Sequence, residues 1–254
     1  MENQAPAHAG LIRGAPAYAP RTPWRPLAAA VATVLIIVLS IGGAILVLGT
    51  GFVAGTPAEP GQWRQDMGTL ATLAVWQAIA IILTLLAATL FGGRLRDVLA
   101  LRPPAASASI YLKAIALMAA LQVGLSVVQY AFFPHDMYAD LRPLVRLFGE
   151  QWILALLVVG VGAPLSEELL FRGFLLSALA RSRLGYLGAA LISTIWWTVL
   201  HAGYSTAGII EVFLIGLFFS WLLWRTGSLR VPIFCHALYN SLIVIVLRHV
   251  PLPG

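Results

Sequence analysis

QWILALLVVGVGAPLSEELLFRGFLLSALA, residues 151–180, is the segment that bears most directly on the fold of this chain. It is long enough to cross a bilayer, since a transmembrane helix needs about 20 mainly apolar residues. Near its middle it carries the charged sequence EELLFR at positions 167–172. A charge at the membrane centre costs at least about 2.5–3.5 kcal/mol on insertion scales, so ionisable residues there usually serve a purpose.

Apolar runs of similar length lie on both sides of this segment. The seven candidate spans cover approximately residues 26–54, 67–92, 109–133, 151–180, 184–203, 207–224 and 231–247. None shows the alternating pattern of a membrane β-strand, and helices satisfy their own backbone polar groups in lipid. The sequence therefore predicts an all-α fold, a polytopic transmembrane helical bundle of about seven spans, with eight as the alternative count.

The composition excludes several other classes of protein. Hydrophobic residues make up 60% of the chain and charged residues only 10%, against about 45–50% and 25% in soluble domains. Such a chain is neither a soluble globular protein nor disordered as a whole. The net charge of +6 is spread over arginines between apolar runs, whereas nucleic-acid binding needs a contiguous basic patch. The single cysteine, Cys235, excludes a disulfide framework.

Loop charges predict how the chain is divided and oriented. We expect a disordered cytoplasmic tail over residues 1–25, transmembrane helices and connectors over 26–150, and a second transmembrane domain over 151–248. Arginines occur in the tail and in the loops 94–102, 181–183 and 225–230, and the loops between them are neutral or acidic. The positive-inside rule then places the N-terminus and the arginine loops in the cytoplasm and, with seven spans, the C-terminus outside.

The two adjacent glutamates in the central span are expected to differ in role. Glu168 and Arg172 are four residues apart and can pair on one helix face. Glu167 points about 100° away from Glu168 on an ideal helix and is left available for chemistry. Pro164 lies three residues upstream and can break the helix, which would open backbone groups beside this site.

Two later spans contribute further polar side chains. Trp197 precedes His201 by one helical turn, and His236 and Asn240 share a face at four-residue spacing. Glu167 and His201 could hold a water that attacks a carbonyl, and His236 and Asn240 could donate hydrogen bonds to the resulting oxyanion. One difficulty is depth, because the predicted spans place Glu167 near the middle of the membrane and His201 near its outer end.

These three motifs, E-E-x-x-x-R at 167–172, W-x-x-x-H at 197–201 and H-x-x-x-N at 236–240, resemble those of the CAAX protease and bacteriocin-processing (CPBP, or Abi) family. That family includes the type II CAAX prenyl endopeptidase, and the resemblance implies an intramembrane endopeptidase. It implies catalytic roles for Glu167, His201, His236 and Asn240, with structural support from Glu168, Arg172 and Trp197. Trp197 stands where phenylalanine is more usual, and we expect it to pack similarly.

The expected partners are the lipid bilayer and a membrane-anchored protein or peptide substrate, in a bacterial inner (plasma) membrane, with no nucleic acid. The sequence leaves the oligomeric state open. There is no G-x-S-x-G motif, and Cys235 lies on a different helix face from His236, so a covalent mechanism is unsupported. No cofactor is expected.

Three alternatives remain at this level. Glu167, His201 and His236 could instead bind a catalytic zinc ion, although no H-E-x-x-H motif is present. The chain could be a non-catalytic membrane scaffold or bacteriocin-immunity protein that uses the same polar cluster structurally. A transporter is the third, but Glu211 is the one further acid within a predicted span, and it lies near a helix end.

Overall fold

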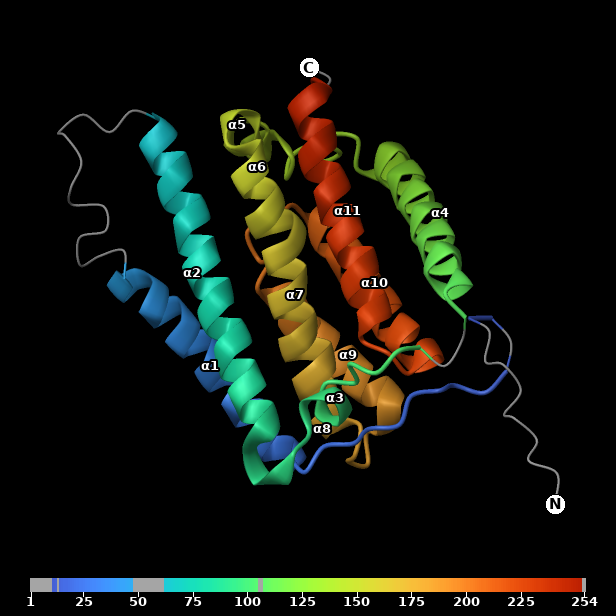
Figure 1. The fold of residues 1–254 in the computed structure, drawn as a ribbon. Coiled ribbons are helices and arrows are strands. Elements are labelled where there is room, and N and C mark those ends of the chain that lie inside the picture. The colour runs from blue at the N-terminus through green and yellow to red at the C-terminus, as the bar shows by residue number, and fades with distance from the viewer. Residues whose placement is uncertain (1–10, 13, 48–61, 105–106, 253–254) are drawn as a thin grey trace.

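The computed structural model describes residues 11–12, 14–47, 62–104 and 107–252. Every regular element in this part of the chain is a helix, and the long helices form one bundle (Figure 1). The all-α prediction is therefore confirmed.

The long apolar helices of the described residues agree with the predicted spans. They are α1 (Pro26–Val47), α2 (Gln62–Thr89), α4 (Ser109–Phe132), the composite segment Trp152–Leu179, α10 (Thr206–Thr226) and α11 (Arg230–His249). The remaining apolar helix, α9 (Gly185–Val199), has only 15 residues. At 1.5 Å per residue it extends about 22 Å, which is less than the roughly 30 Å of a hydrocarbon core. Six long helices and a shorter one confirm a polytopic bundle of about seven spans.

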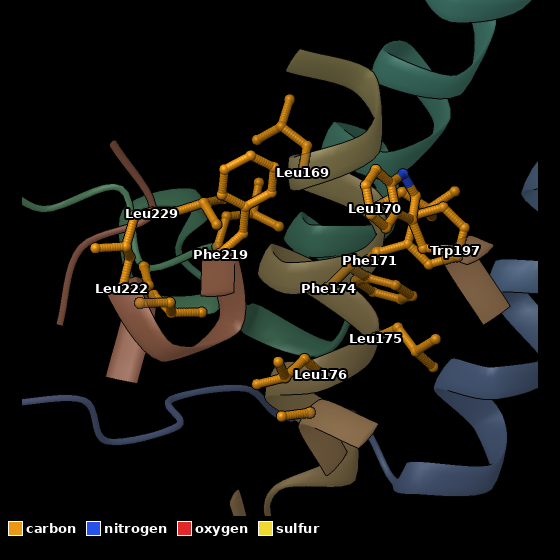
Figure 2. Close-up of a cluster of buried hydrophobic side chains, with 14 of the residues drawn as sticks. Leu169, Leu170, Phe171, Phe174, Leu175, Leu176, Trp197, Phe219, Leu222 and Leu229 are labelled. Atoms are coloured by element: carbon orange, nitrogen blue, oxygen red, sulfur yellow. The ribbon is translucent and has the colours of Figure 1, made fainter. Parts of the chain in front are cut away.

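The composite segment changes helix type along its length. It consists of α6 (Trp152–Ala155), the π-helical η3 (Leu156–Gly162), α7 (Ala163–Glu167), the π-helical η4 (Glu168–Leu176) and α8 (Ser177–Leu179). Pro164 lies between the two π-helical stretches, and such stretches occur frequently at functional sites. All nine residues of η4 are buried, so this stretch is the centre of the bundle. Figure 2 shows its apolar side chains packed with Trp197 of α9 and Phe219 of α10.

Most of the arginine loops meet at one end of the bundle, which we call the arginine end. It carries the N-terminal segment, the connector with η2 (Leu90–Gly92) and α3 (Leu95–Val98), the α8–α9 loop and the α10–α11 turn. Side-chain contacts join these pieces, since Arg181 donates to Thr22 O and Arg230 Nε donates to Leu101 O at 2.7 Å. The C-terminus and α5 (Arg142–Glu150) lie at the opposite end (Figure 1).

The described part of the expected tail is packed against the bundle. Trp24 is 8% exposed, its indole N–H donates to Ala87 O at 2.9 Å, and its ring lies edge-on to Phe91 and Phe174. Tyr18 N donates to Trp224 O at 3.2 Å. We expected a disordered tail from its composition, which does not reveal that Trp24 and Tyr18 hold this segment against the helices. Residues 1–10 and 13 lie outside the described part.

Candidate active site

Glu168 and Arg172 form the buried ion pair expected from their spacing. The Glu168 Oε1 to Arg172 Nη1 distance is 3.1 Å, and both side chains are 0% exposed. Arg172 Nη2 also donates to Gly216 O of α10 at 3.2 Å. The pair therefore joins η4 to α10, and both groups lie inside the bundle.

Glu167 has a different environment from its neighbour. Its Oε2 accepts a hydrogen bond of 2.6 Å from the indole Nε1 of Trp197. Its side chain is 13% exposed, against 0% for Glu168. Glu167 is thus held by a neutral donor and keeps part of its side chain accessible, whereas Glu168 is fully buried in the ion pair.

His236 lies between the two carboxylates. Its Nδ1 is 3.1 Å from Glu168 Oε1, and its Nε2 is 3.9 Å from Glu167 Oε2. The ring stacks on Phe219 of α10, with centroids 4.7 Å apart and planes at 26°. One face of the imidazole is therefore fixed by an aromatic ring, and each ring nitrogen faces one of the two glutamates.

The Trp197 side chain contacts four of the other site residues. Besides its bond to Glu167, its ring lies 4.3 Å from the Arg172 guanidinium carbon. Its centroid is 5.0 Å from that of His201 and 5.7 Å from that of His236. We expected an aromatic residue that packs as phenylalanine would, but the indole N–H adds a hydrogen bond to a carboxylate that phenylalanine cannot make.

The short helix α9 removes the difficulty of depth. Because α9 ends at Val199, His201 lies in the turn that follows a 15-residue helix, which is shorter than the hydrocarbon core is thick. His201 Nδ1 is 3.1 Å from the Trp197 carbonyl oxygen. The span predicted over residues 184–203 was too long, and its apolar composition gives no sign of where the helix stops.

Asn240 contacts the composite segment one turn along α11 from His236. Its Nδ2 donates to Val159 O at 3.0 Å. Ala163 N–H donates to Val158 O in the π-helical register, and the next donor in that register would be Pro164, which has no N–H. The proline therefore leaves the Val159 carbonyl open, and the Asn240 amide satisfies it.

Comparison with known proteins finds a family match for the part of the chain that carries this site. Residues 149–242 match the family model described as type II CAAX prenyl endopeptidase Rce1-like. These residues form an Rce1-like domain. The family resemblance predicted from the three motifs is confirmed, and together with the apolar helices it makes the chain an integral membrane protein.

A second comparison covers a similar length of sequence. A protein of Escherichia coli described as an uncharacterized 24.3 kDa protein is 37% identical over 101 residues, which cover 37% of this chain and 46% of that protein. The match thus spans less than half of that relative. No solved structure matches the chain.

Two residues of the Rce1-like domain that complete the site were not found from sequence. Phe219 is 0% exposed and stacks on His236. Gly216 accepts from Arg172, and a Cβ added there would lie 2.9 Å from both Arg172 Nη2 and Trp197 Cε3. Both are themselves apolar and lie in a mainly apolar run, so a single sequence does not single them out.

Glu211 belongs to a second polar cluster beside the domain's core. It accepts hydrogen bonds from Gln122 Nε2 at 2.9 Å and Gln129 Nε2 at 2.6 Å, both on α4, and from the Tyr239 hydroxyl of α11 at 2.9 Å. From the sequence, Glu211 was only the one further acid within a predicted span, near a helix end. In the structure it joins three helices through neutral donors.

Within the part of the chain that the structure describes, no three His, Cys, Asp or Glu side chains converge in a group that could hold a metal ion. His236 Nε2 lies 3.9 Å from Glu167 Oε2, whereas His201 Nδ1 contacts the Trp197 carbonyl oxygen at 3.1 Å. The residues considered for zinc are thus neighbours without being arranged as a ligand set.

Proposed function

We propose that this protein is an intramembrane endopeptidase that hydrolyses a peptide bond of a membrane-anchored protein or peptide. The Rce1-like domain supports a membrane protease activity of the CAAX type. The observation that carries the proposal is the asymmetry of the adjacent glutamates, because one is sealed by Arg172 and the other is 13% exposed beside a histidine. A purely structural cluster has no need for the second, unsealed carboxylate.

In the proposed reaction Glu167 acts as the general base. It takes a proton from a water molecule as the water oxygen bonds to the scissile carbonyl carbon. The carbonyl oxygen becomes an oxyanion. When the carbon–nitrogen bond breaks, the proton passes from Glu167 to the leaving amine, so that the enzyme returns to its starting state. The Trp197 N–H orients the carboxylate for this task.

His201 has a geometry suited to holding the same water. A backbone carbonyl can only accept, so the contact between Nδ1 and Trp197 O fixes the proton of a neutral ring on Nδ1. The lone pair then lies on Nε2. His201 would thus accept a hydrogen bond from the water that Glu167 deprotonates.

The proposed oxyanion site uses His236 and Asn240. His236 would donate to the oxyanion through Nε2, the ring nitrogen that faces Glu167, 3.9 Å from its Oε2. Asn240 has two N–H bonds on its amide, and anchoring one of them on Val159 O orients the other. Donors fixed in advance stabilise a developing oxyanion most effectively.

The proposed mechanism uses no cofactor, with zinc bound by Glu167, His201 and His236 as the alternative. The proposed location is a bacterial inner (plasma) membrane with the N-terminus in the cytoplasm. Its basis is the gathering of arginines at one end of the bundle.

The test compares the N-termini and C-termini of proteins in membranes of cells that express the wild type, Glu167→Gln or Asp136→Asn. The last is a matched loss of one carboxylate outside the site. We expect cells with the wild type or Asp136→Asn to contain a set of protein termini created by cleavage, and cells with Glu167→Gln to lack that set. Identical termini in all three, with Glu167→Gln still folded, would favour a scaffold or immunity protein. Loss of the termini after chelation, with restoration by zinc, would favour the metal alternative.

A further inference from the structure

A basic cavity lies at the arginine end, apart from the carboxylate site. It has a volume of about 650 Å³, and its charged lining residues are Arg94, Arg96, Asp97, Arg102 and Arg230. Four arginines against one aspartate leave a formal charge of +3. None of these side chains takes part in the proposed reaction.

The one carboxylate that lines the cavity, that of Asp97, already has a cationic partner. Asp97 forms an ion pair with Arg102, which also donates to it through Nε. Arg94 and Arg96 are exposed, and neither side chain has a hydrogen-bond or ion-pair partner among the residues that the structure describes. The cavity therefore presents uncompensated guanidinium groups, whose planar donors match the oxygens of a phosphate.

Hydrogen bonds hold in place the backbone that carries the cavity's arginines. Three successive carbonyls of the connector accept hydrogen bonds from the α10–α11 turn: Ala100 O from Leu229 N at 2.8 Å, Leu101 O from Arg230 Nε at 2.7 Å, and Arg102 O from Ser228 Oγ at 2.6 Å. Val98 and Leu99 are 0% exposed and anchor the connector from inside. A binding site held in this way needs little ordering when a ligand enters.

Exposed apolar side chains lie close in the chain to two of the cavity's arginines. Phe234 lies one turn beyond Arg230 on α11, is 44% exposed, and its ring is 5.3 Å from that of Tyr111 on α4. Leu90 and Phe91, shortly before Arg94, are 50% and 73% exposed. A basic pocket between helix ends with apolar surface beside it suits a lipid, whose headgroup is charged and whose chains are not.

We propose that this cavity binds the phosphodiester headgroup of an anionic phospholipid, with the acyl chains beside the exposed apolar side chains of η2 and α11. A free phosphate shares the headgroup's chemistry, but it would gain nothing from those apolar side chains. The inference does not depend on proteolysis.

The test is native mass spectrometry of the full chain in a neutral detergent, with phosphatidylglycerol or with phosphatidylcholine of the same acyl chains. The wild type should bind phosphatidylglycerol more tightly. A basic residue near an anionic surface contributes roughly a fivefold change in affinity, so Arg94→Gln/Arg96→Gln should lower binding by more than about tenfold. Arg183→Gln removes an exposed arginine of the same end that lies outside the cavity, and its binding should stay within about twofold of wild type.

Three results would overturn the proposal. The first is equal binding of the two lipids by the wild type, which needs no variant and so does not depend on any variant folding. The second is an equal loss for Arg183→Gln and the double variant. The third is displacement of phosphatidylglycerol by inorganic phosphate at the same concentration, which would assign the cavity to free phosphate.

Discussion

Two carboxylates inside this bundle are stabilised in opposite ways. Glu168 faces Arg172 and His236, each 3.1 Å from its Oε1. Glu211 instead accepts hydrogen bonds from neutral donors, two glutamine amides and a phenol at 2.6–2.9 Å. The first cluster is charged and lies in the centre of the fold, and the second is built from neutral donors and joins α4 to its neighbours.

The kind of partner determines how much stability a substitution in each cluster removes. Removing one member of a buried ion pair leaves the other charge unpaired, which costs about 3–5 kcal/mol. Weakening hydrogen bonds between neutral donors and a carboxylate leaves no new charge behind, so the cost is smaller. The same reasoning separates Glu168 from Glu167, because only Glu168 holds Arg172 at ion-pair distance.

The largest effect should come from Glu168→Gln. Arg172, at 0% exposed, would lose its charge partner, and we expect a loss of about 3–5 kcal/mol in unfolding free energy. Glu167→Gln is the matched control, since it changes the adjacent residue in the same way while Arg172 keeps Glu168. Thermal unfolding in detergent measures both. Equal melting temperatures for the two variants would contradict the division between a structural and a free glutamate.

Gly216→Ala should come next. The new Cβ would lie 2.7 Å from Thr194 Cγ2 and 2.9 Å from Arg172 Nη2, so the charged cluster must shift. Such overpacking costs typically about 1–3 kcal/mol. Gly124→Ala in α4 is the control, because no atom lies within 4 Å of its added Cβ, and alanine favours a helix. A variant at 216 that melts like the one at 124 would show that this site is loosely packed.

The two clusters also differ in how far sequence could predict them. Glu168 and Arg172 are four residues apart, so helical periodicity alone brings them together. Gln122 and Gln129 are 89 and 82 residues from Glu211, and their neutral amides do not mark them as partners of an acid. The spans could be predicted from hydropathy because an apolar segment in lipid must satisfy its own backbone hydrogen bonds, which a helix does. The end of α9 and the Asn240–Val159 contact depend on packing and on one proline.

Glu211→Gln should have a smaller, local effect. The buried residues of α4 are Ile110, Ala114 and Met118, all before Gln122, so the second half of this helix depends on the glutamine contacts. Replacing the charged acceptor should cost about 1–2 kcal/mol. Hydrogen exchange should rise in the second half of α4 more than in the first. A loss of unfolding free energy as large as that of Glu168→Gln would contradict the expectation that the cluster with neutral donors is less sensitive to substitution than the ion pair.

The smallest effect should come from Trp197→Phe. The phenyl ring keeps much of the packing beside Arg172 and His236, and the change deletes the N–H that donates to Glu167 Oε2 at 2.6 Å. Because Glu167 is partly exposed, the expected loss in unfolding free energy is about 1 kcal/mol. General-base catalysis typically accelerates a reaction by about 10²–10⁴-fold. If Glu167 is the base and loses the hydrogen bond that orients it, part of this acceleration is lost, and the rate of substrate cleavage at saturation should fall by roughly tenfold. Trp221→Phe, at a ring on the same bundle outside the carboxylate cluster, should leave that rate unchanged. A normal rate in Trp197→Phe with an equally stable fold would show that the indole only fills space, as phenylalanine would.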